Sequence, residues 1–294
     1  MTILVGSDTL VICQGMTGRT ATYHTERMLA YGTPLVAGVT PGKGGRRHLD
    51  LPVFDTVAEA VATTGANTSI IFVPPARAAD AIIEAADANI ALAVCVTERV
   101  PILDMVRVKR RLESGGMRLV GPNSQGILAP GVLQLGVMTT VNARKGDIGI
   151  VSRSASLTSE VVAQVTEAGL GQSTTVGVGG DPVHGLSLAE CVTLFLNDPD
   201  TKGIILIGEI GGSEEEKVAE LLGELNPAKP IIGFIAGRHA PLERRMGHAG
   251  ALITPTLGAA EPKIAALEVA GVRIAKQAHL IGETMRRALM DQRT

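Results

Sequence analysis

Short apolar stretches and helix-like stretches alternate along almost the whole chain, and this alternation restricts the possible folds more than any other feature. In the first half, apolar runs that fit strands lie at residues 10–13, 34–39, 69–73, 91–96 and 117–120. Helix-like segments lie between them at 21–30, 57–63, 76–88 and 102–114. Strands that alternate with helices form parallel sheets covered by helices. We therefore predict a Rossmann-like α/β domain for residues 1–122.

The alternation is interrupted once and then resumes. We predict a connection at residues 123–146, because its larger part, 127–146, is rich in proline and glycine and breaks the pattern. Apolar runs that fit strands follow at 148–151, 173–177, 203–207, 231–235 and 271–274, again with helix-like segments between and after them. We predict a flavodoxin-like parallel α/β domain for residues 147–294.

The composition agrees with this architecture and excludes several classes of protein. Hydrophobic residues make up 45% of the 294 residues but aromatic residues only 2%, so the cores must consist of Val, Ile, Leu and Ala. A formal charge of −2 gives no reason to expect nucleic acid or an anionic membrane as partner. Cys13, Cys95 and Cys191 lie far apart without a CxxC pair, which argues against a zinc site or a disulfide framework.

The chain also lacks targeting signals that we can recognise. Its N-terminus has neither a basic start nor a long apolar run, so we expect no signal peptide. No segment approaches ~18 uninterrupted apolar residues, so we expect no membrane span. We expect the protein in the cytoplasm or, in a eukaryote, in the mitochondrial matrix, where thiols stay reduced.

Two glycine-rich turns follow the first two predicted strands. The turn Gln14-Gly15-Met16-Thr17-Gly18 precedes a helix, an arrangement that points backbone N–H groups at an anion. Its G-x-x-G spacing is not the G-x-G-x-x-G of dinucleotide-binding proteins. The loop 40–47 carries three cations, but no Ser or Thr follows Lys43, so it is not a Walker A motif. These loops suit a phosphorylated nucleotide at the carboxyl ends of the strands, with solvated basic turns as the alternative.

The second half contains a histidine with little steric cover. His248 lies between Gly247 and Ala249-Gly250. A neutral imidazole is a nucleophile near pH 7, so this one could carry a phosphoryl group while Arg244 or Arg245 offsets negative charge. The alternative is a loop histidine without chemistry. Glu209 follows a predicted strand between glycines, where a carboxylate partner for an imidazole would lie.

Seven motifs, in order along essentially the whole chain, resemble those of the succinate–CoA ligase (succinyl-CoA synthetase) alpha-subunit family. They are Gln14-Gly15-x-Thr17-Gly18, Gly38-Val39-Thr40-Pro41-Gly42-Lys43-Gly44-Gly45, Gly121-Pro122-Asn123, Ser152-Arg153-Ser154, Gly177-x-Gly179-Gly180-Asp181-Pro182, Ile207-Gly208-Glu209-Ile210-Gly211-Gly212 and Met246-Gly247-His248-Ala249-Gly250.

The resemblance implies a role for each matching position. His248 would be the phosphoryl carrier and Glu209 the carboxylate that orients it. Coenzyme A would be held by Thr17, Gly18, Arg19, Thr20, Lys43, Val96, Thr97 and Glu98. The transferable phosphate would lie at a helix that Ser154, Ala155 and Ser156 open. No residue of this chain is expected to bind a metal.

The resemblance also implies partners and a reaction of the tricarboxylic acid cycle. A separate beta subunit with an ATP-grasp fold would bind ATP or GTP and Mg²⁺, in an αβ or α2β2 assembly. A small carboxylic acid would become an acyl-CoA through a phosphohistidine and an acyl phosphate.

Several positions depart from the family pattern. Arg19-Thr20 stands in place of Ser-Gln, Ala155 in place of glycine, Ser159 in place of a tyrosine near the substrate, Ser124-Gln125 in place of Cys-Pro, and residues 254–258 in place of a loop rich in glycine and lysine. We expect an altered acid specificity, for a bulkier, hydroxylated or sulfonated carboxylate, with drift without consequence as the alternative.

Three other functions compete with this interpretation. Within the same chemistry, a malate–CoA ligase or a citryl-CoA synthetase remains open. A coenzyme A-binding regulatory module without phosphoryl transfer is a second alternative, although the chain retains His248 and Glu209. A nicotinamide-dependent dehydrogenase is disfavoured, because the first turn lacks G-x-G-x-x-G.

Overall fold

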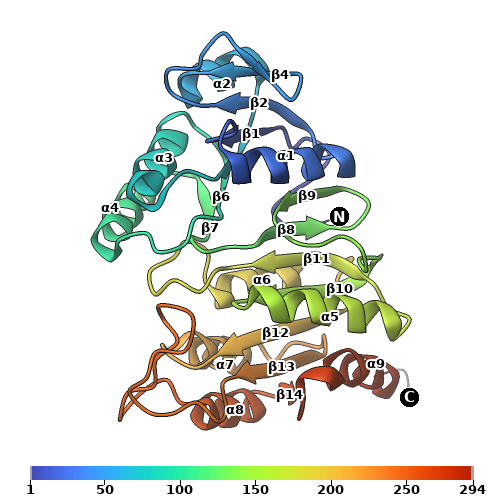
Figure 1. The fold of residues 1–294 in the computed structure, drawn as a ribbon. Coiled ribbons are helices and arrows are strands. Elements are labelled where there is room, and N and C mark those ends of the chain that lie inside the picture. The colour runs from blue at the N-terminus through green and yellow to red at the C-terminus, as the bar shows by residue number, and fades with distance from the viewer. Residues whose placement is uncertain (1, 293–294) are drawn as a thin grey trace.

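The computed structural model describes residues 2–292, which form two seven-stranded sheets stacked one above the other (Figure 1). The first sheet contains β1 (Val11–Gln14), β2 (Leu35–Val39), β3 (Arg47–His48), β4 (Leu51–Phe54), β5 (Thr68–Ile71), β6 (Leu92–Cys95) and β7 (Arg118–Val120). Its spatial order is β3-β4-β2-β1-β5-β6-β7. Without β3, which pairs antiparallel at the edge, this is the 3-2-1-4-5-6 order of a Rossmann fold. The predicted Rossmann-like fold is confirmed.

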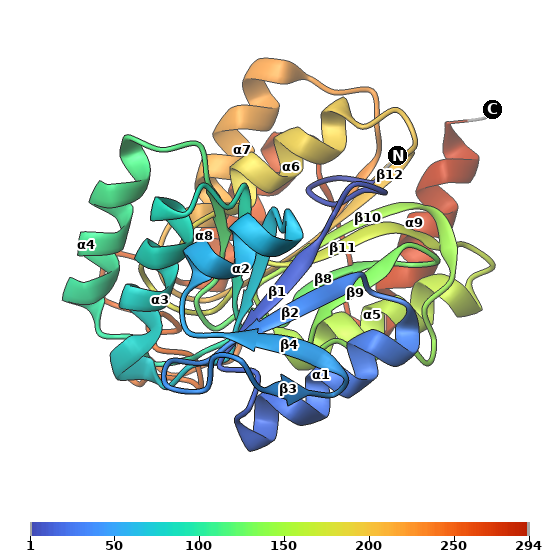
Figure 2. The same cartoon turned by 90° about the horizontal axis from the view of Figure 1, so that it is seen from above.

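Four helices cover the first sheet, as the sequence predicted. They are α1 (Arg19–Tyr31), α2 (Val57–Thr64), α3 (Pro75–Asp87) and α4 (Ile102–Glu113). Helices α2 to α4 lie on one face and α1 on the other (Figure 2). The sequence pattern did not predict β3 and β4, because residues 47–54 contain only a short apolar run interrupted by Pro52.

The second sheet contains β8 (Gly126–Ala129), β9 (Leu133–Gly136), β10 (Lys145–Ser152), β11 (Gln172–Gly177), β12 (Gly203–Glu209), β13 (Ile231–Ala236) and β14 (Arg273–Ile274). Its order is β14-β13-β12-β10-β11-β8-β9. The parallel strands β10 to β14 therefore follow the 2-1-3-4-5 order of flavodoxin, which confirms the predicted flavodoxin-like fold.

Five α-helices and one 3₁₀ helix accompany this sheet. They are α5 (Ala155–Glu167), α6 (Leu188–Asn197), α7 (Glu214–Leu225), α8 (Ala260–Val269), η1 (Ala278–Leu280) and α9 (Ile281–Asp291). Helices α6, α7 and α8 cover one face, and α5 and α9 pack together on the other (Figure 2).

The segment predicted as a connection contains two strands, which is a correction to the sequence analysis. β8 and β9 form an antiparallel hairpin, and β8 pairs with β11 of the second sheet. The glycines that suggested a loop serve close strand contact instead, because a Cβ on Gly126 would lie only 1.9 Å from Leu135 O. The hairpin also packs against α1 of the first domain, where Thr33 Oγ1 donates a hydrogen bond of 2.6 Å to Gln134 O. It therefore joins the cores of both sheets.

The two sheets meet where β7 and β11 end. The segment after β11 pairs with the edge of β7, since the N–H of Gly185 donates to Gly121 O (2.8 Å) and that of Leu186 to Leu119 O (2.6 Å). A Cβ on Gly179 would lie 2.1 Å from Pro122 O. The loops at the carboxyl ends of these strands are therefore in direct backbone contact.

A buried ion cluster holds α7 and α8 to the end of β12. Lys263 on α8 and Glu215 on α7 are both fully buried and form an ion pair. Lys263 Nζ also donates to Gly212 O and to Glu216 Oε2, each at 3.0 Å. The other oxygen of Glu215 accepts a hydrogen bond of 3.0 Å from the backbone N–H of Glu209. The cluster thus fixes the turn that follows β12.

Membrane-spanning helices and clustered metal ligands are both absent from the described residues. No helix within residues 2–292 combines the length and the hydropathy needed to cross a membrane. In the same part of the chain, no group of three or more His, Cys, Asp or Glu side chains could hold a metal ion. The three cysteines are buried and unpaired, and burial raises the pKa of Cys13 and Cys95 to about 12. These two thiols are therefore protonated at neutral pH.

We predict that Lys263→Met lowers the free energy of unfolding by about 3–5 kcal/mol, because it leaves the Glu215 carboxylate buried without its cation. Lys217→Met is the matched control, since Lys217 is 60% exposed and pairs with Glu214 at the surface, where such a pair contributes at most about 1 kcal/mol. Urea denaturation followed by circular dichroism measures both values. Equal losses in the two variants would contradict the importance of the cluster.

Candidate active site

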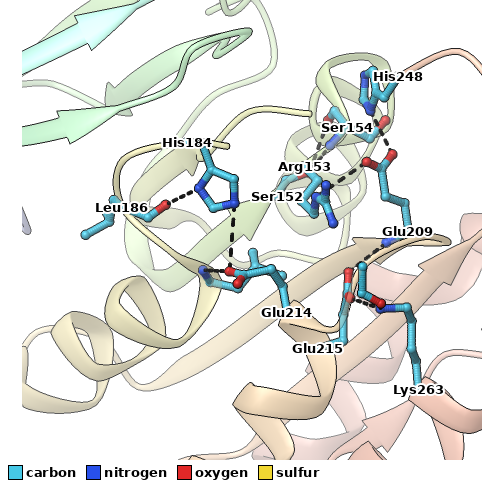
Figure 3. Close-up of polar contacts among 12 residues, drawn as sticks. Ser152, Arg153, Ser154, His184, Leu186, Glu209, Glu214, Glu215, His248 and Lys263 are labelled. Atoms are coloured by element: carbon cyan, nitrogen blue, oxygen red, sulfur yellow. Dashed lines mark hydrogen bonds and ion pairs between the residues drawn. The ribbon is translucent and has the colours of Figure 1, made fainter. Parts of the chain in front are cut away.

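His248 lies in the loop between β13 and α8, and its side chain is 28% exposed. Its Nδ1 atom is 2.7 Å from Oε2 of Glu209, the last residue of β12 (Figure 3). The Glu209 side chain is only 9% exposed. The structure thus brings together a partly accessible imidazole and a buried carboxylate from distant segments.

This contact determines which ring nitrogen can react. An ionised carboxylate only accepts hydrogen bonds, so Nδ1 of His248 carries the hydrogen and donates it to Glu209. The other nitrogen, Nε2, makes no hydrogen bond within residues 2–292. The hydrogen bond to Glu209 raises the pKa of His248 above its usual value, while partial burial of the ring acts in the opposite direction. The neutral ring therefore presents an Nε2 lone pair as a nucleophile.

Two glycines allow the histidine loop to pack closely on neighbouring turns. A Cβ on Gly180 would lie 2.4 Å from Nδ1 of His248, so the ring rests against the Gly180 backbone. Gly211 has a φ of +91°, and a Cβ there would lie 1.9 Å from Gly250 O. Neither position has space for a side chain, which explains the glycines in both motifs.

Arg153 is a third charged member of the site. It follows the last residue of β10, its side chain is 4% exposed, and its Nε atom lies 3.4 Å from Oε1 of Glu209 (Figure 3). By contrast, Arg244 and Arg245, which the sequence suggested as the cations near the histidine, are both exposed. The sequence analysis included Arg153 in a motif but gave it no role. Its place at the carboxyl end of a parallel strand was the available signal.

The first turn of α5 begins directly after Arg153. Ser154 caps the helix, because its Oγ accepts a hydrogen bond of 3.4 Å from the N–H of Leu157. Ala155 and Ser156 are exposed, and their N–H groups are among those that no carbonyl within the helix can reach. Ser159 lies one turn further on, with its Oγ 3.5 Å from Ala155 O. Figure 3 draws Ser154 beside His248. This helix start can bind an anion.

Asp181 connects the histidine to the first domain. It follows Gly180, is 3% exposed, and accepts hydrogen bonds from the Asn123 side chain and the Val100 backbone. Burial raises the pKa of Asp181 above its usual value, and Glu98 adds to this effect. The charge of Asp181 also acts on His248. The loops that follow β6 and β7 are therefore linked to the second domain beside the imidazole.

A cavity of about 730 Å³ lies at the carboxyl ends of β1, β2 and β5. Gly18, Arg19 and Thr20 line it at the start of α1, together with Arg77 of α3, which the sequence analysis missed. Arg77 gave no motif signal, because it lies within an ordinary Ala-rich helix. An apolar wall and two cations fit a phosphorylated nucleotide such as coenzyme A.

The remaining residues predicted to hold coenzyme A lie around this cavity. Lys43 Nζ donates a hydrogen bond of 2.9 Å to Thr17 Oγ1, next to Gly18. Thr97 Oγ1 donates one of 2.6 Å to the carbonyl of Val73, a residue of the cavity wall. Val96 and Glu98 flank Thr97, and Glu98 is exposed. Their contact with a ligand remains a prediction.

We predict that Glu209→Gln lowers the pH midpoint of the His248 titration, by about one pH unit or more, because the charged hydrogen-bond acceptor that favours the imidazolium form is lost. NMR of labelled histidine rings measures this midpoint. Glu261→Gln is the control, since Glu261 is an exposed carboxylate paired with Arg238. An unchanged midpoint in Glu209→Gln would show that the contact does not control the ring.

Comparison with known sequence families identifies both halves of the chain. Residues 6–99 match a family described as CoA binding domain, and residues 151–273 match one described as CoA-ligase. Succinate–CoA ligase [ADP-forming] subunit alpha of Staphylococcus aureus strain Mu50 is 49% identical over 285 residues, covering 97% of this chain and 94% of that protein. The corresponding alpha subunit 2 of Archaeoglobus fulgidus is 50% identical over 276 residues, covering 94% and 96%.

Solved structures share the fold at lower identity. ATP citrate lyase from Methanothrix soehngenii, in complex with citrate and coenzyme A, matches with a TM-score of 0.88 at 23% identity over 98% of this chain. Acetyl-coenzyme A synthetase 1 of Ca. Korarchaeum cryptofilum, in complex with phosphate and ADP, matches with a TM-score of 0.74 at 21% identity over 93% of this chain. This chain spans 51% and 59% of their respective lengths. With two relatives at 49% and 50% identity over nearly its full length, the chain belongs to the family of succinate–CoA ligase alpha subunits.

Proposed function

We propose that this chain is the alpha subunit of a nucleotide-dependent acid–CoA ligase in which His248 carries the phosphoryl group. The observation that supports this most directly is the 2.7 Å contact between Nδ1 of His248 and Glu209, which leaves Nε2 free. The relatives described above are named for succinate, so succinate is the proposed acid. They do not favour the malate and citrate alternatives.

His248 accepts the phosphoryl group at Nε2. The Nε2 lone pair forms a bond to the γ-phosphorus of the nucleotide while the bond to the leaving diphosphate breaks. The ring keeps its hydrogen on Nδ1 and becomes positively charged, and Glu209 stabilises that charge. The same contacts serve the reverse reaction.

The start of α5 then binds the phosphoryl oxygens. The N–H groups of Ala155 and Ser156 and the hydroxyl of Ser154 supply hydrogen bonds, and the helix dipole favours negative charge there. A carboxylate oxygen of the acid attacks the phosphorus as the bond to Nε2 breaks, which gives an acyl phosphate. Ser159 lies one turn along the same helix, where we place the acid.

Coenzyme A supplies the thiol that displaces phosphate from the acyl phosphate. In this chain, Arg19, Thr20 and Gly18 line the cavity that we assign to its phosphates. Lys43 and Thr17 form the adjoining hydrogen bond, and Val96, Thr97 and Glu98 lie on the side of the cavity that leads to Asp181. This arrangement directs the thiol end of the ligand towards His248.

The nucleotide requires a partner, because the chain has no ATP-binding loop of its own. We propose a beta subunit with an ATP-grasp fold that binds ATP or GTP and Mg²⁺, in an αβ or α2β2 assembly. The names of the relatives, as alpha subunits, support a partner. The exposed apolar side chains of Leu242, Met246 and Leu257, near or within the histidine loop, suit coverage by another protein. The proposed location is the cytoplasm, or the mitochondrial matrix in a eukaryote.

We expect the complex with its partner subunit to take up acid-labile label from γ-labelled ATP or GTP, and His248→Ala to take up none. Denaturing gel electrophoresis at alkaline pH, where phosphohistidine survives, measures the label on this chain. His239→Ala is the control, because His239 is an exposed histidine nearby in sequence that the proposal does not use. No label on the wild type, or equal label on His248→Ala, would favour a coenzyme A-binding module without phosphoryl transfer.

We also predict that Lys43→Ala weakens coenzyme A binding at least tenfold while leaving the labelling of His248 largely intact, because Lys43 adjoins the ligand cavity of the other domain. Isothermal titration calorimetry measures the affinity, and the labelling assay measures the phosphohistidine. If labelling fell in parallel with coenzyme A binding, the proposed division of labour between the two domains would be wrong.

A further inference from the structure

The buried guanidinium of Arg153 has one carboxylate within ion-pair distance, that of Glu209. Glu209 divides its two oxygens between two partners, with Oε2 bonded to His248 and Oε1 lying 3.4 Å from Arg153 Nε. Neither Arg153 Nε nor Glu209 Oε1 has a hydrogen-bond partner elsewhere in residues 2–292, although both atoms are buried. Each therefore depends on the other for electrostatic compensation.

The charges around His248 come from three elements of the second domain. Glu209 ends β12, Asp181 follows β11, and Arg153 follows β10. Glu209 and Asp181 both favour the imidazolium form, whereas Arg153 opposes it. Without Arg153, two carboxylates and none of these cations would act on the ring. An imidazole held as its cation has no lone pair on Nε2 and cannot attack phosphorus.

We propose that Arg153 is a positioning residue of this site: its guanidinium fixes the Glu209 carboxylate against His248 and offsets its charge, so that the imidazole remains available as a nucleophile. The same guanidinium lies against Gly250 of the histidine loop, since a Cβ there would be 3.2 Å from Arg153 Nη2. Arg153 thus contacts both the carboxylate and the loop that it orients. The kinetic consequence rests on the proposed function, but the effect on the ring does not.

The effect on the ring is tested by NMR titration of His248 in the full chain, without partner or nucleotide. We expect Arg153→Met to raise the pH midpoint of His248 by about one pH unit or more, because a buried cation near the ring is removed. Arg153→Lys should stay close to the wild-type midpoint, because it retains the charge. Arg144→Met is the matched control, since Arg144 is exposed just before the opposite end of β10, and it should leave the midpoint unchanged.

Other groups near Arg153 must be followed in the same spectra. His184 is buried, hydrogen-bonded to Leu186 O at 3.2 Å and close to Glu214. Burial chiefly lowers the pKa of His184, with Arg153 contributing in the same direction. Its resonance therefore should move upwards in Arg153→Met as well, which distinguishes loss of a charge from a local change at His248.

Arg153→Met leaves Glu209 without its cation, so thermal unfolding of each variant accompanies the titration. If that variant does not fold, the pair Arg153→Met with Glu209→Gln, compared with Glu209→Gln alone, removes both charges and tests the direct effect of the guanidinium on the ring. A midpoint that does not rise when Arg153 is replaced by Met, or that rises equally with Lys, would overturn the proposal.

The kinetic consequence is measured with the complex, through the rate of His248 labelling as a function of pH. In Arg153→Met, the pH of half-maximal rate should move upwards, so the labelling rate falls about tenfold at neutral pH for each pH unit and recovers as the pH rises. A merely structural role would lower the rate equally at every pH. Absence of labelling in the wild type would reject the proposed function and leave the titration result valid.

Discussion

The hydrogen bond between Glu209 and His248 is the contact on which the organisation of the second domain depends. It joins residues 39 positions apart in the sequence and fixes which ring nitrogen faces outward. A buried carboxylate beside an imidazole requires support, because burial of an ionised group is costly unless it is paired. The Glu215–Lys263 cluster holds the backbone of Glu209, and Arg153 lies at its second oxygen. The ion pairs in this region therefore maintain one geometry.

The two domains contribute to a single site because their strands end beside each other. The Gly179–Gly180 turn lies against Pro122 on one side and against the His248 ring on the other. Asp181, the next residue, is bound by Asn123 and Val100 of the first domain. A ligand in the cavity of the first domain thus lies on the side of the molecule towards which the histidine faces. This proximity gives the proposed thiol and phosphoryl chemistry a common location.

Much of the fold was predictable, because the periodicity of apolar residues determines both strands and helices in an α/β chain. Residues 126–136 were not, since their glycines are equally typical of a loop and of two strands in close contact, and only the packing against α1 distinguishes the two. His248 and Glu209 could be chosen from the sequence because glycines surround both. Arg153 and Arg77 could not be assigned roles, because an arginine within an ordinary strand end or helix carries no local mark of its partner.

The sequence by itself determined the succession of elements, the two α/β domains and the positions of the glycine-rich turns, since these depend on local periodicity and on backbone freedom. The tertiary structure alone decided which charges face each other. Arg153 rather than Arg244 or Arg245 acts on His248, because β10 and β12 are neighbours in the sheet while the two loop arginines are exposed to solvent. Electrostatic interaction depends on distance and burial, and the order of the sheets sets both.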